Sequence, residues 1–250
     1  MQFLTMTCAF AMFYYLGYTA YLRRQGTGAV TLACVMAAIG VSRRSKAAFH
    51  ARSSSQAQTS LSKDRLCDQR YVILGAGSAG LGVATQIRDA MVTADGVSKE
   101  DSNSKFWLVD KEGLLFERDQ GAQKIHDEAR TQFVRRKEEG WDESRISLLD
   151  VVRRVHPTVL IGCSTAGGAF NEDVIKAMMG GMEEGARPIV LPLSNPIRLS
   201  EARPEDVLRW TNGKALIATG SPFGQVEVEA SGRKVGFECV FSFSRIPGKF

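Results

Sequence analysis

Short apolar runs alternate with segments of helical period over most of the chain. The apolar runs predict strands at residues 70–74, 105–109, 158–161, 189–191 and 215–218. The segments between them predict helices at residues 78–92, about 120–138, 147–155, 172–179 and 205–210. This alternation is typical of βαβ units. We therefore expect an α/β fold, a Rossmann-like doubly wound parallel sheet with helices on both faces.

Three of these helices carry more specific signals. Asn171 and Pro204 stand at plausible helix starts, because Asn favours the N-cap and Pro the first helical position. The helix predicted over residues 120–138 has its apolar residues on one face. These residues are Ala122, Ile125, Ala129 and Phe133.

The first 64 residues differ from the rest. Residues 1–22 carry no charge and precede Arg23 and Arg24, so they are either a membrane anchor, a buried apolar helix, or sequence foreign to the fold. Residues 25–42 are small and apolar all round, as expected of a helix packed deep in a soluble core, or of a weak second span. We expect a leader at 1–24, a helix and polar connection at 25–64, the main domain at 65–235 and a divergent tail at 236–250.

Composition and charge narrow the function classes. The 250 residues are 44% hydrophobic, which suffices for one sizeable domain. The net charge of +5 comes from scattered basic residues without interleaved aromatics, which argues against nucleic acid as a partner. The cysteines are odd in number and form no CxxC pair, which argues against a disulfide framework or zinc site and favours a reducing compartment. They are Cys8, Cys34, Cys67, Cys163 and Cys239.

A glycine-rich turn follows the first apolar run, in "YVILGAGSAGLGVATQI". Gly75 would allow a tight turn, Gly77 would let a pyrophosphate approach the backbone, and Gly80 would let helix and strand pack closely. The helix N-terminus would then face the phosphates. We therefore expect a dinucleotide at this turn; the alternative is a strand-to-helix turn without a ligand.

Asp110 closes the second strand, in "FWLVD". A Rossmann fold places there the acid that hydrogen-bonds an adenosine ribose. The spacing from Gly80 is longer than usual, but the polar segment "TADGVSKEDSNS" can absorb the excess as a surface loop. The alternative is a turn residue in "DKEG". If Asp110 binds the ribose, its charge favours NAD over NADP, although Lys111 could offset it.

Three polar loops follow later strands: "GCSTAGGAF", "LSNP" and "TGSPF". Carboxyl ends of parallel strands present their loops to ligands, so we expect these loops at one site, with the amide of Asn195 meeting a carboxylate or a cofactor amide. His50, His126 and His156 are isolated, and Cys163 has no assigned base. We therefore predict no nucleophile and no metal site within this chain.

Several stretches together resemble malic enzyme: "GTGAVTLACVMAAI", "DQRYVILGAGSAGLGVA", "FWLVDKEGLL", "PTVLIGCSTAGGAF", "PIVLPLSNP" and "ALIATGSPF". The resemblance covers that family's NAD(P)-binding domain. It implies oxidative decarboxylation of malate to pyruvate and CO₂, with NAD or NADP as hydride acceptor, Mg²⁺ or Mn²⁺, a homo-oligomer, and a cytoplasmic or mitochondrial location. The cofactor-binding candidates are Gly75, Ala76, Gly77, Ser78, Ala79, Gly80, Asp110, Lys111, Ser164, Ala166 and Asn195.

The chain departs from this family at both ends of the resemblance. The family's N-terminal domain, which supplies a catalytic tyrosine and lysine and an acidic pair for the metal, is not matched. Leu22 and Arg23 stand where the family has an aspartate pair, and the tail "GFECVFSFSRIPGKF" replaces a paired-asparagine motif. We expect a truncated or misassembled coding sequence. The alternative to a malic enzyme is a non-catalytic dinucleotide-binding fragment, tethered to a membrane or not.

Overall fold

The computed structural model describes most of the predicted main domain. It covers residues 26–49, 65–116, 128–136, 139–141, 146–223, 226–230 and 233–237. The predicted leader at 1–24, residues 50–64 of the predicted connection and most of the divergent tail lie outside the described residues. The membrane anchor considered for residues 1–22 and the replacement of the family's aspartate pair by Leu22 and Arg23 therefore stay predictions.

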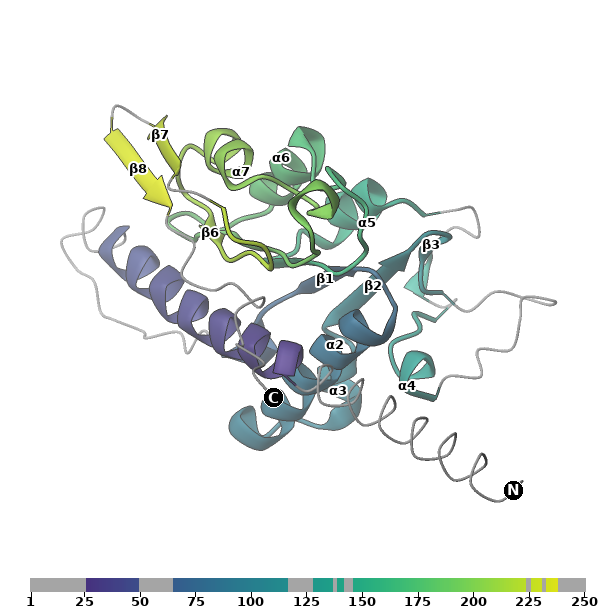
Figure 1. Cartoon of the computed structure of the whole chain (residues 1–250). Helices are drawn as coiled ribbons and strands as arrows, with labels where there is room; N and C mark the ends of the chain where they lie inside the picture. Colours follow the sequence, from purple (N-terminus) through teal and green to yellow (C-terminus); the bar gives the residue numbers. More distant parts are fainter. Residues whose placement is uncertain are drawn as a thin grey trace, which may run out of the picture.

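A six-stranded sheet forms the centre of the molecule, in the order β3-β2-β1-β4-β5-β6 (Figure 1). β1 lies between β2 and β4 and is parallel to both, with Val72 opposite Trp107 and Leu160. This confirms the predicted parallel sheet and all five predicted strands, each shifted by two residues or fewer. The sheet is mixed, because β3 is antiparallel to β2. The strands are β1 Tyr71–Leu74, β2 Phe106–Asp110, β3 Gly113–Leu114, β4 Val159–Gly162, β5 Ile189–Pro192 and β6 Leu216–Ile217.

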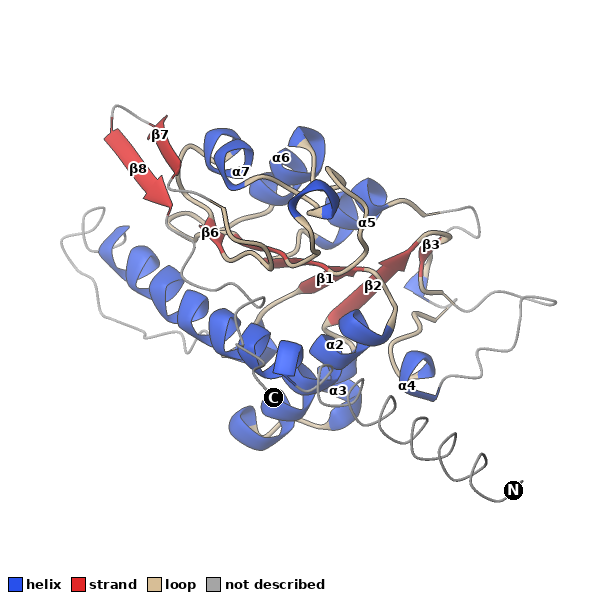
Figure 2. Ribbon diagram, in the orientation of Figure 1, coloured by secondary structure: helices blue, strands red, loops and turns tan. Residues whose placement is uncertain are grey.

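Helices cover both faces of the sheet, as predicted (Figure 2). Tyr71 and Ile73 face one hydrophobic cluster with the helix Gly26–Phe49 and α2. Val72 and Leu74 face a second cluster with α5, α6 and α7, because successive side chains of a strand point to opposite faces. The helices are α2 Ser78–Ala90, α3 Lys99–Asn103, α4 Glu128–Thr131, α5 Leu148–Val155, α6 Glu172–Gly180 and α7 Pro204–Trp210; β7 Val226–Ala230 and β8 Arg233–Phe237 form a separate hairpin.

Both predicted helix starts are confirmed. Asn171 Oδ1 accepts a hydrogen bond from Val174 N at 3.0 Å, and Pro204 is the first residue of α7. α2 ends at Ala90, two residues earlier than predicted, and continues as the π-helical segment η2, Met91–Asp95. The Asn171 side chain thus satisfies a backbone N–H group that has no partner inside the helix.

The helix predicted over residues 120–138 is wrong in its C-terminal part. Among the described residues of this stretch, helical structure is confined to α4. Phe133 lies in the turn after α4, where its ring meets Phe106 edge to face at a centroid distance of 5.4 Å. Arg135 N then donates to Leu115 O at 2.9 Å. The chain therefore leaves the helix because burying Phe133 and pairing with the strand region outweigh the apolar periodicity.

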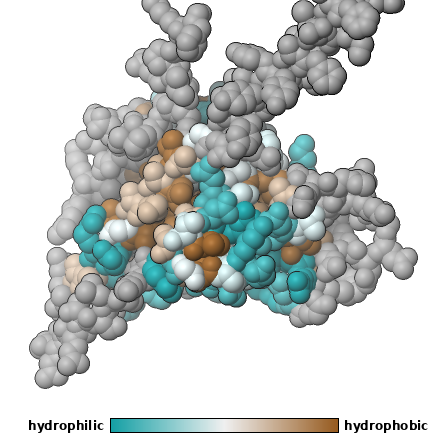
Figure 3. All heavy atoms as spheres, turned by 90° about the horizontal axis from the view of Figure 1, so that it is seen from below, coloured by the Kyte–Doolittle hydropathy of each residue, from teal (hydrophilic) through white to brown (hydrophobic). Residues whose placement is uncertain are grey.

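The helix Gly26–Phe49 packs on the sheet with one side only. Val35 and Ile39 are buried against the core, and Arg187 N donates to Ser42 Oγ at 3.0 Å. Met36 is 53% exposed, so the predicted deep burial is wrong: one sheet face can cover only one side of a helix. By length and composition this helix could cross a membrane, a test that core helices also pass. Seen from below, hydrophobic residues lie among hydrophilic ones (Figure 3).

Candidate functional site

The candidate site lies where the strand order reverses. The chain passes from β1 to β2 on one side, and then crosses to place β4 on the other side of β1. In open α/β sheets, ligands bind outside the carboxyl ends of the strands at such a switch point. The glycine turn follows β1 at this point, and the loop that begins at Cys163 follows β4.

Two glycines allow the backbone segments of this site to touch. Gly75 has φ of 107°, and a Cβ built on it would lie 2.6 Å from Cys163 O. A Cβ on Gly80 would lie 1.9 Å from Gly75 O. Both contacts are with backbone, which cannot move aside, so a side chain at either position would force β1, α2 and the loop after β4 apart.

Gly77 has a different environment. A Cβ on Gly77 would meet nothing within 4 Å, and Gly77, Ser78 and Ala79 are exposed. Gly77 is the N-cap of α2 without a side-chain cap, so no N-cap side chain covers the first turn of this helix. Ala76 is 1% exposed and offers the site only its backbone. The turn therefore fits an anionic pyrophosphate, which helix N-termini attract.

Asp110 stands at the end of β2, as predicted, but it has a partner that the sequence did not indicate. Its Oδ2 accepts a hydrogen bond from Arg130 Nη2 at 2.8 Å, and its Oδ1 accepts one from Lys111 N at 2.9 Å. The Asp110 side chain remains 30% exposed. Because each carboxylate oxygen has two lone pairs, Asp110 can still accept a hydrogen bond from a ribose hydroxyl.

A fully buried carboxylate joins the loops after β4 and β5. Glu201 is 0% exposed. Its Oε1 accepts hydrogen bonds from Ser164 N at 2.8 Å, Ser164 Oγ at 3.0 Å and Ser194 Oγ at 2.6 Å. Its Oε2 accepts one from Ser194 N at 3.3 Å. Sequence reasoning missed Glu201, because "LSEARPED" resembles an exposed polar loop.

The same two serines hold the tip of the loop after β4. Thr165 N donates to Ser194 Oγ at 2.9 Å, and Ala166 N donates to Ser164 Oγ at 3.1 Å. Thr165 has φ of 59°, a left-handed conformation that is strained for a β-branched residue. The loop therefore keeps this shape because its hydrogen bonds compensate for the strain.

The three polar loops meet at one edge of the sheet, as predicted. Ser221 Oγ, from the loop after β6, donates to Asn195 Oδ1 in a short hydrogen bond. Gly220 N donates to Pro192 O at 3.2 Å. Asn195 is itself exposed at this edge. Hydrogen bonds thus join the loops after β4, β5 and β6 at this edge, beside the glycine turn.

Neither Cys163 nor the described histidine offers a nucleophile or base. Burial, and then the charge of Glu201, raise the pKa of the Cys163 thiol to about 12, so the thiol stays protonated at neutral pH. His156 is the C-cap of α5; His50 and His126 lie outside the described residues. No group of three metal-ligating side chains occurs in the described part of the chain, so these residues do not fit Mg²⁺ or Mn²⁺.

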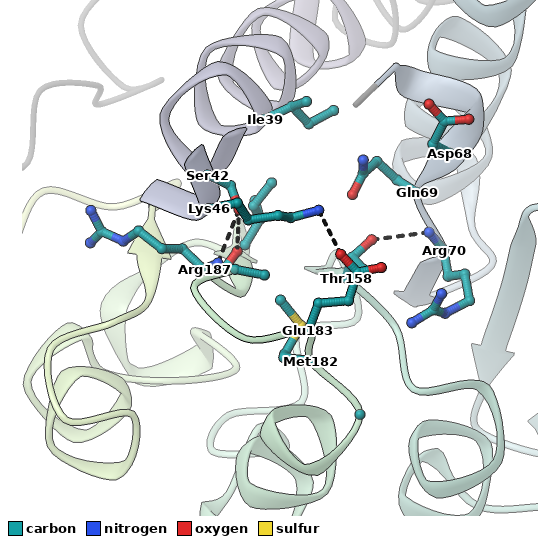
Figure 4. A pocket seen from close by; sticks show the side chains of 13 residues that line it. Ile39, Ser42, Lys46, Asp68, Gln69, Arg70, Thr158, Met182, Glu183 and Arg187 are labelled. Atoms are coloured by element: carbon teal, nitrogen blue, oxygen red, sulfur yellow. Dashed lines mark hydrogen bonds and ion pairs between the residues drawn. The ribbon is translucent and has the colours of Figure 1, made fainter. Parts of the chain in front are cut away.

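A cavity of about 110 Å³ lies at the opposite end of the sheet (Figure 4). It is bordered by Arg70, Thr158 and Ile189 at the amino ends of β1, β4 and β5, and by the helix Gly26–Phe49. Across it, Lys46 Nζ points to Glu183 Oε2 at 2.9 Å. The cavity is therefore separate from the site at the carboxyl edge.

A profile of the family "Malic enzyme, NAD binding domain" matches residues 24–239. "NAD-dependent malic enzyme 3" of Bacillus subtilis (strain 168) is 43% identical over 205 residues, which are 81% of this chain and 32% of the relative. "Malolactic enzyme" of Leuconostoc mesenteroides is 40% identical over 215 residues, 85% of this chain and 34% of the relative. The chain thus spans about a third of the length of these relatives.

The fold comparison agrees with the sequence comparison. The crystal structure of Entamoeba histolytica malic enzyme superposes with a TM-score of 0.51 at 23% identity, covering 78% of this chain and 32% of that one. At this identity the likeness supports the fold alone. The mixed six-stranded sheet with helices on both faces is therefore shared with a solved member of that group.

Proposed function

The chain belongs to the malic enzyme NAD-binding domain family, and from this premise we propose that it binds NAD across the carboxyl ends of β1, β2 and β4. The observation that carries the proposal is the open space at Gly77, beside two glycines that the backbone contacts require. In this arrangement the N–H groups of Gly77, Ser78 and Ala79 hold the pyrophosphate. Asp110 accepts a hydrogen bond from the adenosine ribose.

The other half of the cofactor would lie over β4 and β5. A doubly wound sheet binds one mononucleotide on each side of the switch point. If the adenosine binds beside Asp110, the nicotinamide half lies near Ser164, Ala166 and Asn195. The Asn195 amide can then pair with the nicotinamide carboxamide or with a substrate carboxylate.

We propose that the reaction served by this site is the oxidative decarboxylation of malate to pyruvate and CO₂. Bound NAD supplies the hydride acceptor. The residues of this chain bind and orient the cofactor. The resemblance assigns acid–base and metal groups to parts of the family that this sequence does not match, and the described residues hold no group of three metal ligands. The 250-residue chain is therefore expected to bind NAD without oxidising malate at an appreciable rate, since losing a general base alone costs about 10²–10⁴-fold.

We further propose a preference for NAD over NADP. The carboxylate of Asp110 pairs with a ribose 2′-hydroxyl and repels a 2′-phosphate. Arg130 and Lys111 act against this preference, because the Arg130 guanidinium lies 2.8 Å from Asp110. The preference is therefore expected to be small, about tenfold or less.

A titration of the full chain with NAD and NADP tests the cofactor proposal, with Gly77→Trp as the variant and Gly180→Trp as the matched control. Nothing lies within 4 Å of a Cβ on either glycine, and neither has a left-handed φ; Gly180 ends α6 and is outside the site. Binding lost in Gly77→Trp alone would support the proposal, whereas binding lost in neither variant would contradict it. NADH formation from malate with Mn²⁺ is measured in parallel; turnover that depends on Gly77 would overturn the expected lack of activity.

Location and assembly stay predictions. "NAD-dependent malic enzyme, mitochondrial" of Saccharomyces cerevisiae is 42% identical over 203 residues, and other relatives are bacterial, so a cytoplasmic or mitochondrial location suits the family. A homo-oligomer and a membrane tether by residues 1–22 are further proposals from the sequence. Cell fractionation of the full chain and light scattering of the purified chain would test them.

A further inference from the structure

We propose that the carboxylate of Glu201 is a positioning residue for the cofactor. It holds the loop after β4 in the shape that receives the nicotinamide half of NAD. The inference rests on the proposed NAD binding and adds a residue to it that lies outside the glycine turn. Glu201 is a buried ionisable group that has no role in the cofactor binding proposed above.

The groups around the Glu201 side chain are hydrogen-bond donors, so the side chain must accept. All four hydrogen bonds that its side chain accepts in the described part of the chain come from uncharged donors, two serine hydroxyls and two backbone N–H groups. Burying a carboxylate is costly unless such donors surround it. An ionised carboxylate can accept at both oxygens, whereas a glutamine amide can accept at only one.

The carboxylate also sets the direction of both hydroxyls. Each serine hydroxyl has one proton, and in both cases the hydroxyl hydrogen-bonds Glu201 Oε1. The lone pairs of Ser194 Oγ and Ser164 Oγ are then turned toward Thr165 N and Ala166 N. Through these two successive hydrogen bonds, Glu201 Oε1 orders the backbone at the exposed tip of the loop.

Gly162 makes room for this arrangement. A Cβ at Gly162 would lie 2.5 Å from Cδ and 2.6 Å from Oε2 of Glu201. The last residue of β4 is thus a glycine at the position where the carboxylate packs against the strand. The end of β4 and the segment that carries Glu201 therefore fit each other closely around the carboxylate. A polar surface loop would not need such a fit.

The strained residue connects the network to binding. Thr165 keeps φ of 59° while its N–H is bonded to Ser194. If an NH₂ group replaces one oxygen of Glu201, Ser194 loses a hydrogen bond in either orientation of the amide, through its N–H at Oε2 or its hydroxyl at Oε1. Ser194 then shifts, and Thr165 can relax toward φ below zero. The loop would then withdraw its ordered N–H groups from the nicotinamide side, while the glycine turn and Asp110 keep their shape.

Calorimetric titration of the full chain with NAD and with AMP tests the proposal, because AMP occupies the adenosine half alone. The variant is Glu201→Gln, and the control is Glu184→Gln, at an exposed glutamate. We expect Glu201→Gln to weaken NAD binding about tenfold or more, as loss of hydrogen bonds to a charged group does. AMP binding should stay within about twofold of the unchanged chain, and the control should bind both ligands normally.

Each other outcome has a defined meaning. Unchanged NAD binding in Glu201→Gln, or an equal loss for NAD and AMP, would overturn the positioning role. An unchanged chain that binds neither ligand would overturn the proposed function and this inference with it. If Glu201→Gln gives no cooperative thermal unfolding, Ser194→Ala decides: it removes the hydroxyl that links Glu201 to Thr165 N. A loss confined to NAD supports the proposal, while unchanged binding of NAD overturns it.

Discussion

The two sides of the switch point are built in different ways. On the β1–β2 side, the shape comes from backbone in direct contact, with Gly80 against Gly75 O, and the polar group Asp110 is partly exposed. On the β4–β5 side, the shape comes from side chains that surround a buried carboxylate. The first side should tolerate a change of charge at Asp110 but no side chain at Gly75 or Gly80; the second should be sensitive to the loss of a single acceptor.

This contrast predicts how substitutions should behave. Backbone contact fails through steric overlap, which acts on folding. A buried hydrogen-bond network fails through an unpaired polar group, which acts on local shape as well as on stability. Variants of the two sides should therefore separate in unfolding and binding measurements.

Gly80→Ala should have the largest effect. Its Cβ would lie 1.9 Å from Gly75 O, so α2 and β1 must separate, and the free energy of unfolding should fall by about 3 kcal/mol. Gly77→Ala is the control, since its Cβ meets nothing within 4 Å. Urea denaturation of both variants measures the difference; equal stabilities would contradict the account of the first side.

Gly77→Trp should come next, in binding and not in folding. A large side chain at the N-terminus of α2 fills the space assigned to the pyrophosphate. NAD affinity should fall about 100-fold, which is about 2.7 kcal/mol. The unfolding free energy should change by less than about 1 kcal/mol. A stable variant that still binds NAD would show that the phosphates lie elsewhere.

Ser194→Ala probes the second side through stability. The substitution removes one donor to Glu201 and leaves Thr165 N without its acceptor, so the unfolding free energy should fall by about 1–3 kcal/mol. Ser45→Ala, on the helix Gly26–Phe49, is the control. Thermal and urea unfolding of both variants are compared. A fall in unfolding free energy as small as that of the control would mean that the network adds little to stability.

The smallest effect is expected at the partly exposed pair of Asp110 and Arg130. Ion pairs of this exposure contribute about 1 kcal/mol or less to stability. Asp110→Ala should weaken NAD and improve NADP binding, because Arg130 becomes available to a 2′-phosphate. Arg130→Ala should weaken NADP binding. Parallel titrations measure both ratios, and NAD binding that is unchanged in Asp110→Ala would remove Asp110 from the site.

The sequence predicted those parts of the structure that depend on neighbouring residues. The strands were found because buried parallel strands are continuous apolar runs, and the glycine turn because three glycines stand at fixed spacing. Arg130 and Glu201 were missed because Arg130 pairs with a residue 20 positions away and Glu201 joins one 37 positions away. A charged residue in a polar segment gives no sign of where its side chain points. The failure of the helix at Phe133 has the same cause: tertiary packing with Phe106 outweighed the local pattern.

The two edges of the sheet bear on solubility. Edge strands can pair with another chain and start aggregation when they are long and flat. Here both edge strands, β3 and β6, have two residues each, and β3 is antiparallel to its neighbour. A second copy would find too few aligned N–H and C=O groups for stable strand addition in the described part of the sheet. The apolar strands at the centre are thus kept from acting as a template for aggregates.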